Sequence, residues 1–280
     1  HNRVALNEPQ RYLSAKELIK FHESEFAREN KTVGVKYSED TYNIYVSNAR
    51  SIVNKKKSLE HIFSERDIDV GIINEINTKK PPRLRGYHQF SKIVGRRSHG
   101  ISMYVSNRYQ GRVLRVPDES ELELVHVIFK DTVPQLHILA VYLDVERGKP
   151  DDVSRVWSIL ENKANDLIES GAGVIVCGDF NRPSLTCEKK SFGTDLLERW
   201  LEDGKFHLVN DRKVNTRYDP ASGKGSLLDL AIISDNLARS VKKFEVDTHK
   251  KWTPFVLIKN GDQLVKKTSC LLYTSPSPRD

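Results

Sequence analysis

Short apolar runs alternate along the chain with longer amphipathic stretches, and this pattern predicts buried strands interleaved with helices. Three apolar runs end in polar residues and predict buried strands at 43–48, 69–75 and 174–178. Amphipathic spacing predicts helices over 51–66, 151–170 and 194–203. Further strands are expected at 87–93, 100–106, 111–116, 122–130, 136–143, 228–234, 254–259 and 263–268.

This order predicts an α/β fold, because strands and helices interleave while the middle of the chain holds consecutive strands. The arrangement expected is a four-layered α/β sandwich, in which two packed mixed β-sheets are flanked by helices. Residues 1–42 form a polar preamble or linker with one helix, which a capping box at Ser14–Glu17 begins. The folded domain is expected over 43–269, and 270–280 differs in character from it.

The composition indicates which class of molecule the chain binds. The net charge of +7 and the pI near 9.1 fit a polyanion such as nucleic acid. Cys177, Cys187 and Cys270 lack metal-ligand spacing and cannot all pair, so we expect a reduced, intracellular compartment. The sequence has no apolar run long enough to cross a membrane, and it begins with His1, which suggests a piece of a longer reading frame.

The residues that carry chemistry stand at the ends of the predicted strands. Carboxylates there can bind a hard divalent cation or orient a water, and amides can donate to a phosphoryl oxygen. Taken singly, each has a simpler explanation, such as an Asx-turn or a solvated cap. Together they predict phosphodiester hydrolysis, with the metal on the glutamate. The residues are Asn48, Glu75, Tyr142, Asp179, Asn181 and Asp229.

Five segments together resemble the endonuclease/exonuclease/phosphatase (DNase I-like) superfamily. The likeness is greatest to the endonuclease domain that precedes reverse transcriptase in non-LTR retrotransposons, and it covers roughly residues 43–269. The segments are Ser47-Asn48-Ala-Arg50-Ser, Ile73-Asn-Glu75, Ala140-Val-Tyr142, Gly178-Asp179-Phe-Asn181 and Ser226-Leu-Leu-Asp229-Leu.

The resemblance implies a role for each of these residues. Glu75 would be the main ligand of Mg²⁺ or Mn²⁺, and Tyr142 would contact the phosphate. Asn48 would either support the metal ligands from behind or act on the phosphate side. Asp179 and Asn181 would position the nucleophile and the phosphate, and Asp229 would orient a catalytic histidine. The residues expected to contact DNA are Arg182, Thr216, Arg217 and Ser226, with Lys55–Lys57 and Arg96/Arg97 as further backbone contacts.

The sequence departs from the family at its end. The superfamily closes with a Ser/Thr-Asp-His tripeptide, and neither form occurs in this chain. His249 lies nearby, but its polar surroundings suggest an insertion before a later strand pair. The tripeptide would fit after Ser269, and Pro276 and Pro278 exclude a central strand beyond that point. We therefore expect 270–280 to be non-native and this chain to be weak or inactive.

The function expected is a Mg²⁺-dependent DNA endonuclease of a retroelement, which leaves a 3′-hydroxyl to prime reverse transcription. Its partners would be DNA and a reverse transcriptase domain downstream, with no membrane; the domain would be monomeric and its parent element nuclear. The alternatives are a DNA-repair abasic-site endonuclease and a catalytically dead nucleic-acid-binding module. Target sequence, host and the number of metal ions are not encoded in any recognisable pattern.

Overall fold

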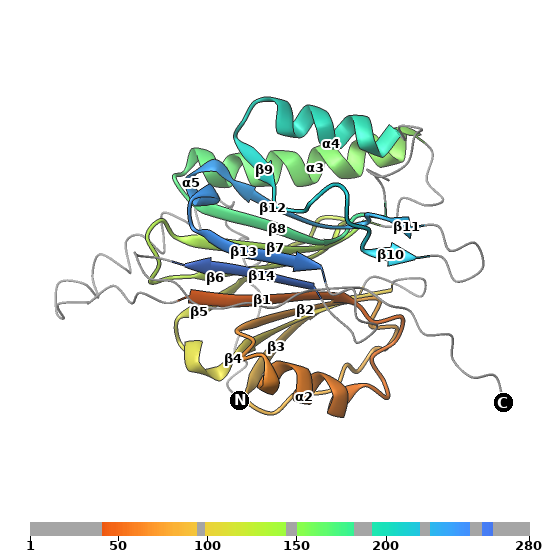
Figure 1. The fold of residues 1–280 in the computed structure, drawn as a ribbon, viewed down its shortest axis with the longest axis vertical. Helices are drawn as coiled ribbons and strands as arrows, with labels where there is room; N and C mark the ends of the chain where they lie inside the picture. Colours follow the sequence, from red (N-terminus) through yellow and green to blue (C-terminus); the bar gives the residue numbers. More distant parts are fainter. Residues whose placement is uncertain are drawn as a thin grey trace, which may run out of the picture. The chain divides into compact units, whose positions relative to one another are not determined.

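The computed structural model describes residues 41–93, 99–143, 150–181, 192–218, 225–246 and 254–259. All of them lie within one compact unit, residues 37–280. In that unit two six-stranded sheets face each other, and helices cover their outer faces (Figure 1). The expected four-layered α/β sandwich is thereby confirmed.

The first sheet has the strand order β13-β14-β1-β2-β4-β3. Its β1 and β2 are parallel, and every other neighbouring pair is antiparallel. The strands are β1 (Thr41–Asn48), β2 (Val70–Asn74), β3 (Tyr87–Lys92), β4 (Ile101–Ser106), β13 (Val241–Val246) and β14 (Pro254–Lys259).

The second sheet has the order β5-β6-β7-β8-β12-β9, and only β7 and β8 are parallel. A two-stranded ribbon of β10 (Arg217–Tyr218) and β11 (Gly225–Ser226) stands beside it. The strands of the sheet are β5 (Val113–Val116), β6 (Glu123–Phe129), β7 (Leu136–Tyr142), β8 (Gly173–Asp179), β9 (Phe206–Leu208) and β12 (Asp229–Ser234).

Each parallel strand pair is joined by a helix, as parallel neighbours require. Helix α2 (Lys56–Glu65) links β1 to β2, and α3 (Pro150–Glu169) links β7 to β8. α4 (Phe192–Glu202) packs beside α3. The short α5 (Asp235–Ala238) follows β12, and the 3₁₀ turn η1 (Asn107–Tyr109) follows β4. No helix within the described ranges is long and apolar enough to span a membrane.

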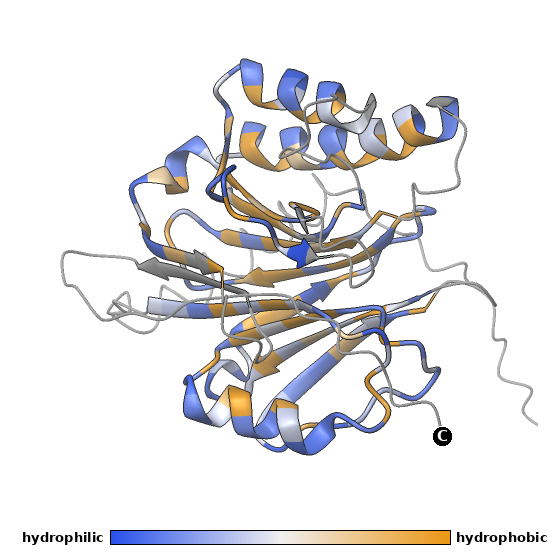
Figure 2. Cartoon of the chain, turned by 45° about the vertical axis from the view of Figure 1, so that its right-hand side comes forward, coloured by the Kyte–Doolittle hydropathy of each residue, from blue (hydrophilic) through white to orange (hydrophobic). Residues whose placement is uncertain are grey.

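The main core fills the space between the two sheets. Alternate residues of the strands point inward, for example Ile44, Ile72, Ile138 and Ile175, none of which is exposed. The outer face of the first sheet is covered by Leu59 and Phe63 of α2, while α3 and α4 cover the second sheet with tryptophans that meet edge to face. Figure 2 shows apolar residues concentrated on the strands and on the helix sides that face them.

Several elements differ from the sequence prediction. The helix expected to begin at residue 51 begins at Lys56, because the N–H groups of Ser51 and Ile52 donate to the carbonyls of Glu75 and Ile76 instead. Strands β9, β10, β11 and β13 were not predicted, since they are short or rich in charge. The preamble helix and the 263–268 strand lie outside the described residues.

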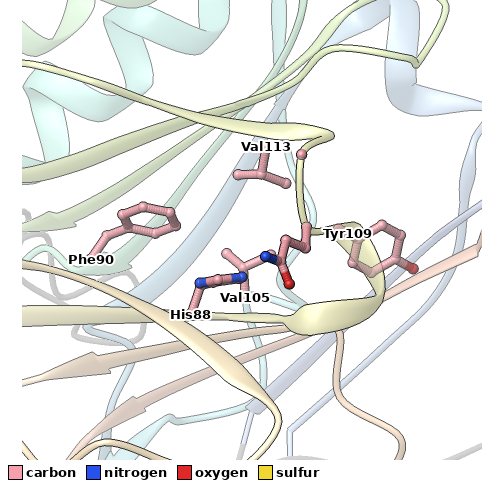
Figure 3. A pocket seen from close by; sticks show the side chains of 7 residues that line it. His88, Phe90, Val105, Tyr109 and Val113 are labelled. Carbon is pink, nitrogen blue, oxygen red and sulfur yellow. The ribbon is translucent and has the colours of Figure 1, made fainter.

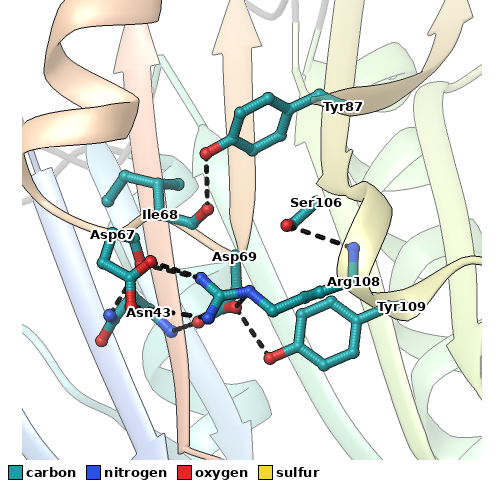
Figure 4. Close-up of polar contacts among 8 residues, drawn as sticks. All are labelled: Asn43, Asp67, Ile68, Asp69, Tyr87, Ser106, Arg108 and Tyr109. Atoms are coloured by element: carbon teal, nitrogen blue, oxygen red, sulfur yellow. Dashed lines mark hydrogen bonds and ion pairs between the residues drawn. The ribbon is translucent and has the colours of Figure 1, made fainter. Parts of the chain in front are cut away.

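A buried polar cluster holds together the end of the sandwich where β2 begins (Figure 4). Asp69 accepts hydrogen bonds from the backbone N–H of Asn43 at 2.7 Å and from the Tyr109 hydroxyl at 2.7 Å. The Arg108 guanidinium lies 2.9 Å from the same carboxylate and 2.7 Å from Asp67. Burial raises the pKa of Asp69 to about 6. The cluster therefore ties β1, β2 and the β4–β5 connection together.

A small pocket opens between the edge strands β3 and β5 at this same end (Figure 3). Its lining includes the imidazole of His88 and the rings of Phe90 and Tyr109. His88 pairs in register with Val105, and Val105 pairs with Val70 at the start of β2. The pocket is thus remote from the carboxyl ends of the parallel strands.

Two histidines are buried on the helix-covered face of the second sheet. His126 and His137 are each at most 2% exposed, and a 3.0 Å hydrogen bond joins their ring nitrogens Nε2 and Nδ1. Burial, and then the neighbouring His137 ring, hold the pKa of His126 well below its usual value. His126 is therefore neutral in the folded protein at pH values where the unfolded chain would bind a proton.

We expect acid to destabilise the fold through His126. The pKa of His126 is lower in the folded protein than in the unfolded chain. The stability that the neutral ring contributes is therefore complete above about pH 6.5, and below that pH the free energy of unfolding falls by about 1.4 kcal/mol per pH unit. Urea unfolding between pH 7.5 and 5.5 should show a shallower pH dependence for His126→Leu than for the wild type. His88→Leu, at an exposed imidazole, is the control; an equal change of slope in both variants would contradict this assignment.

Candidate functional site

The carboxyl ends of the two parallel strand pairs meet at one end of the sandwich. Asn48 at the end of β1 pairs in register with Asn74 of β2. In the opposite sheet, Tyr142 at the end of β7 pairs with Asp179 of β8, which also pairs with Asp229. The alternation of each strand points these side chains inward, between the sheets. The predicted strand-end residues are therefore brought together.

The Asn48 amide connects the two sheets. Its Nδ2 donates to Glu75 Oε1 at 2.6 Å and to Asp179 Oδ2 at 2.7 Å, while its Oδ1 accepts from the N–H of Arg50 at 3.0 Å. Both protons of one amide thus hold two carboxylates side by side. Glu75 has a φ of +48°, so the chain leaves β2 in a left-handed conformation just at this carboxylate.

The two acids in the second sheet are buried side by side. Asp179 is 2% exposed and Asp229 is 5% exposed. Burial raises the pKa of Asp179 to about 6, against the hydrogen bonds from Asn48 and from the N–H of Asn181, and the Glu75 charge raises it further. Burial and the adjacent Asp179 charge raise the pKa of Asp229 well above its usual value. Such a cluster favours binding of positive charge.

The turn after β8 depends on a glycine. Gly178 has a φ of +145°, and a β-carbon on it would lie 1.9 Å from the carbonyl oxygen of Val141, so no other residue fits the parallel partner strand so closely. Beyond it, Asn181 has a φ of +51°, its N–H donates to Asp179 Oδ1 at 2.8 Å, and its Nδ2 donates to the carbonyl of Leu143 at 2.9 Å. The turn therefore fixes both predicted side chains.

Tyr142 stands beside residues that the sequence analysis did not single out. The ring of His99 lies with its centroid 5.3 Å from that of Tyr142. Glu123, the register partner of Tyr142 on β6, accepts a 2.8 Å hydrogen bond from the N–H of Gly100. The segment leading into β4 is thus held against the site.

The predicted DNA-contacting residues lie in different environments. Thr216 is 1% exposed, and its hydroxyl accepts hydrogen bonds from the backbone N–H groups of Leu228 and Asp229 at 3.0 and 3.1 Å. The Thr216 side chain therefore anchors the start of β12. Its contact with DNA stays a prediction, which the burial of Thr216 does not favour.

Arg217 and Ser226 pair in register in the β10–β11 ribbon, and both are partly exposed. The Arg217 charge lowers the pKa of Asp179 and of Asp229, so it lies within electrostatic reach of the site. Arg182, like Arg96 and Arg97, lies outside the described residues. Lys55 donates to the carbonyl of Ala49 at 2.5 Å, whereas Lys56 and Lys57 are exposed beside it.

The donor set suits a hard divalent cation. Glu75 and Asp179 supply carboxylate oxygen atoms, and Mg²⁺ is commonly bound by one or two carboxylates with waters and phosphates completing its shell. No group of three or more His, Cys, Asp or Glu within the described ranges could enclose a metal ion by itself. The residues therefore fit an open, partly hydrated Mg²⁺ or Mn²⁺ site rather than a closed protein cage.

The segment that contains His249 connects two paired strands. Its described flanks, Val246 of β13 and Pro254 of β14, are register partners. β14 then runs antiparallel beside β1, with Phe255 opposite Tyr45, so the chain enters β14 at the end of the sheet where Asn48 lies. The segment follows β13 and precedes β14, and its interpretation as an insertion before a later strand pair stays a prediction. Residues 247–253 themselves lie outside the described residues.

Asn74 is a site residue that sequence reasoning missed. It is fully buried, and neither its Oδ1 nor its Nδ2 has a hydrogen-bonding partner among the described residues. It lies next to Asn48 on the neighbouring strand, and both side chains face the opposite sheet. One carboxylate oxygen of Asp229 is likewise buried without a hydrogen-bonding partner among the described residues. Buried polar atoms of this kind are typical of functional sites.

We expect Asn48→Leu to lower the free energy of unfolding by about 2 kcal/mol or more, because it removes two hydrogen bonds to charged groups and leaves the carboxylates facing each other. Asn74→Leu, the matched neighbour, removes no described hydrogen bond and should change it by less than about 1 kcal/mol. Urea unfolding in EDTA at pH 7 measures both. Equal losses in the two variants would contradict the role given to the Asn48 amide.

Comparison with known proteins points to nucleases. Residues 136–253 match a family model described as endonuclease-reverse transcriptase. This stretch includes Tyr142, Asp179, Asn181 and Asp229 but not Asn48 or Glu75. A search of curated proteins found no match to the sequence.

Solved structures share the fold at low sequence identity. The endonuclease domain of TRAS1, a telomere-specific non-LTR retrotransposon, superposes with a TM-score of 0.61 and 14% identity over 79% of this chain and 100% of that chain. The AP endonuclease LMAP from Leishmania major gives a TM-score of 0.66 and 14% identity over 79% and 88% of the two chains. The 3′ phosphatase NExo from Neisseria, bound to a product DNA hairpin, gives a TM-score of 0.62 and 13% identity over 79% of this chain and 100% of that chain. The family model matched by residues 136–253 and the fold shared with these nucleases both support the resemblance to the endonuclease/exonuclease/phosphatase (DNase I-like) superfamily.

Proposed function

We propose that the chain is a divalent-metal-dependent DNA endonuclease domain of a non-LTR retroelement. It would hydrolyse one phosphodiester and leave a 3′-hydroxyl from which a downstream reverse transcriptase domain extends. The observation that carries the proposal is the Asn48 amide, which holds Glu75 and Asp179 together at the ends of two strands from opposite sheets.

Each residue has a task that its contacts support. Glu75 would hold Mg²⁺ or Mn²⁺, and the metal would supply charge neutralisation at the phosphoryl oxygens. Asp179 would orient the attacking water; its pKa of about 6 lies near the working range of a general base. Asn181, fixed by its bond to Leu143, keeps a second amide proton for the phosphate. Tyr142 would contact the phosphate from β7.

Asp229 is suited to hold an imidazole. One of its carboxylate oxygens is buried without a described partner, and such an oxygen accepts readily from a ring N–H. His249 is the candidate for that ring, because its segment leads from the end of β13 to the start of β14, and β14 begins beside β1 near the Asn48 end. This departs from the expectation that the histidine would belong after Ser269.

One observation favours a retroelement over a repair enzyme. The matched family model couples an endonuclease to reverse transcriptase in its description. The net charge of +7 suits a domain that binds the phosphate backbone of DNA, but this holds equally for a retroelement endonuclease and for a repair endonuclease. The likeness to abasic-site endonucleases is one of fold, so we include an abasic substrate in the test.

The test is nicking of supercoiled plasmid with Mg²⁺ or Mn²⁺. We expect slow nicking, since the family's Ser/Thr-Asp-His order is absent, and we expect Glu75→Gln and Asp179→Asn each to reduce it at least about 100-fold. Glu65→Gln, an exposed glutamate on α2, should leave the rate unchanged. Nicking that survives both site substitutions would contradict the proposal. DNA binding without any nicking would support the binding module instead.

His249→Ala is the separate test of the imidazole. We expect it to reduce the residual nicking rate by about 100-fold or more, because general acid–base catalysis contributes on that scale. Asp229→Asn should give a similar loss, and the double variant should lose little more than either single one, since the two act as a unit. An unchanged rate in His249→Ala would exclude this residue as the catalytic histidine. Faster cleavage of a duplex with one abasic site than of intact DNA would favour the repair reading.

A further inference from the structure

The imidazole of His99 stands at the site, and no role has been given to it. His99 immediately precedes Gly100 at the entry to β4, and its side chain is partly exposed. The first residue of β4, Ile101, pairs in register with Asn74, so His99 lies at the same end of the sandwich as Asn48 and Glu75. It is thus a partly exposed ring beside buried strand ends.

Two contacts fix the His99 ring. Its plane is tilted by 48° against Tyr142, with the ring centroids 5.3 Å apart, a distance typical of aromatic pairs. Its Nδ1 lies 3.3 Å from Asn77 Oδ1, and the backbone N–H of Asn77 donates to the His99 carbonyl at 2.9 Å. Asn77 is two residues after Glu75 and has a φ of +48°. Side chain and backbone therefore hold His99 to the loop that carries Glu75.

The Asn77 contact assigns the two ring nitrogens different tasks. A side-chain carbonyl oxygen only accepts, so Nδ1 carries the proton that it donates to Asn77. Nε2 has no partner among the described residues. A protonated ring can then donate from Nε2 while keeping its bond to Asn77, and a phosphate oxygen is a strong acceptor for such a charged donor.

We propose that His99 is a DNA-contacting residue, whose Nε2 donates to a backbone phosphate beside the one that Tyr142 contacts. The inference rests on the proposed function and extends it to a residue outside the strand-end set. The ionisable groups that face it are Tyr142 from β7 and Glu123 from β6, which binds the N–H of Gly100 next to His99.

The test compares DNA affinity at different pH values. The dissociation constant for a short duplex is measured in EDTA at pH 6 and pH 8 for the wild type and His99→Gln. We expect His99→Gln to weaken binding about tenfold at pH 6 and much less at pH 8, because only the charged donor is lost. The carboxylates of the site are the same in both proteins, so the difference between the two profiles belongs to His99. His88→Gln, at the far end of the sandwich, should keep the wild-type profile.

Asn77→Leu provides a second, independent variant. This substitution removes the partner of His99 Nδ1 and should weaken DNA binding about threefold in the wild-type background. It should leave DNA binding unchanged in the His99→Gln background. Thermal unfolding of each variant checks that the fold is intact. Wild-type affinity and pH profile in His99→Gln, with nicking still lost in Glu75→Gln, would overturn the inference and leave the proposed function standing. A wild-type protein that binds no DNA would overturn both.

Discussion

The site depends on one amide that reaches across two sheets. Asn48 ends β1 of the first sheet, yet it donates to Asp179 of the second sheet as well as to Glu75 of its own. Without these two bonds the carboxylates would face each other in a region that is largely closed to water. The same geometry that brings the strand ends together therefore requires a neutral donor between the acids. A divalent cation would serve the same electrostatic need from the open side.

The fold provides this geometry through two similar units. In each sheet a strand, a helix and a parallel strand place two carboxyl ends next to each other, and the sheets face each other so that both pairs meet. β12 runs the opposite way, so its first residue, Asp229, reaches the same place. The opposite end of the sandwich carries the Asp69 cluster instead. Paired polar groups around Asp69 at one end, and the polar atoms of Asn74 and Asp229 without described partners at the other, agree with a division between scaffold and site.

Much of this architecture follows from the sequence, because buried strands with polar ends are encoded locally in runs such as Val174–Asp179. What escaped prediction depends on partners far away in the chain. The charged strand β13 is recognisable only beside β14, and the start of α2 shifts because Ser51 pairs with the loop after β2. Asn74 and His99 look like ordinary polar residues, since their significance comes from the opposite sheet and from Asn77.

The central claim is that Glu75 and Asp179, held by Asn48, form a binding site for a divalent cation. The most direct measurement is a crystal of the protein soaked in Mn²⁺, with the ion located by its anomalous scattering. The account predicts a single strong peak about 2.2 Å from a carboxylate oxygen of Glu75 and close to Asp179, with waters completing the shell. A strong peak elsewhere, with none at this pair of carboxylates, would contradict it.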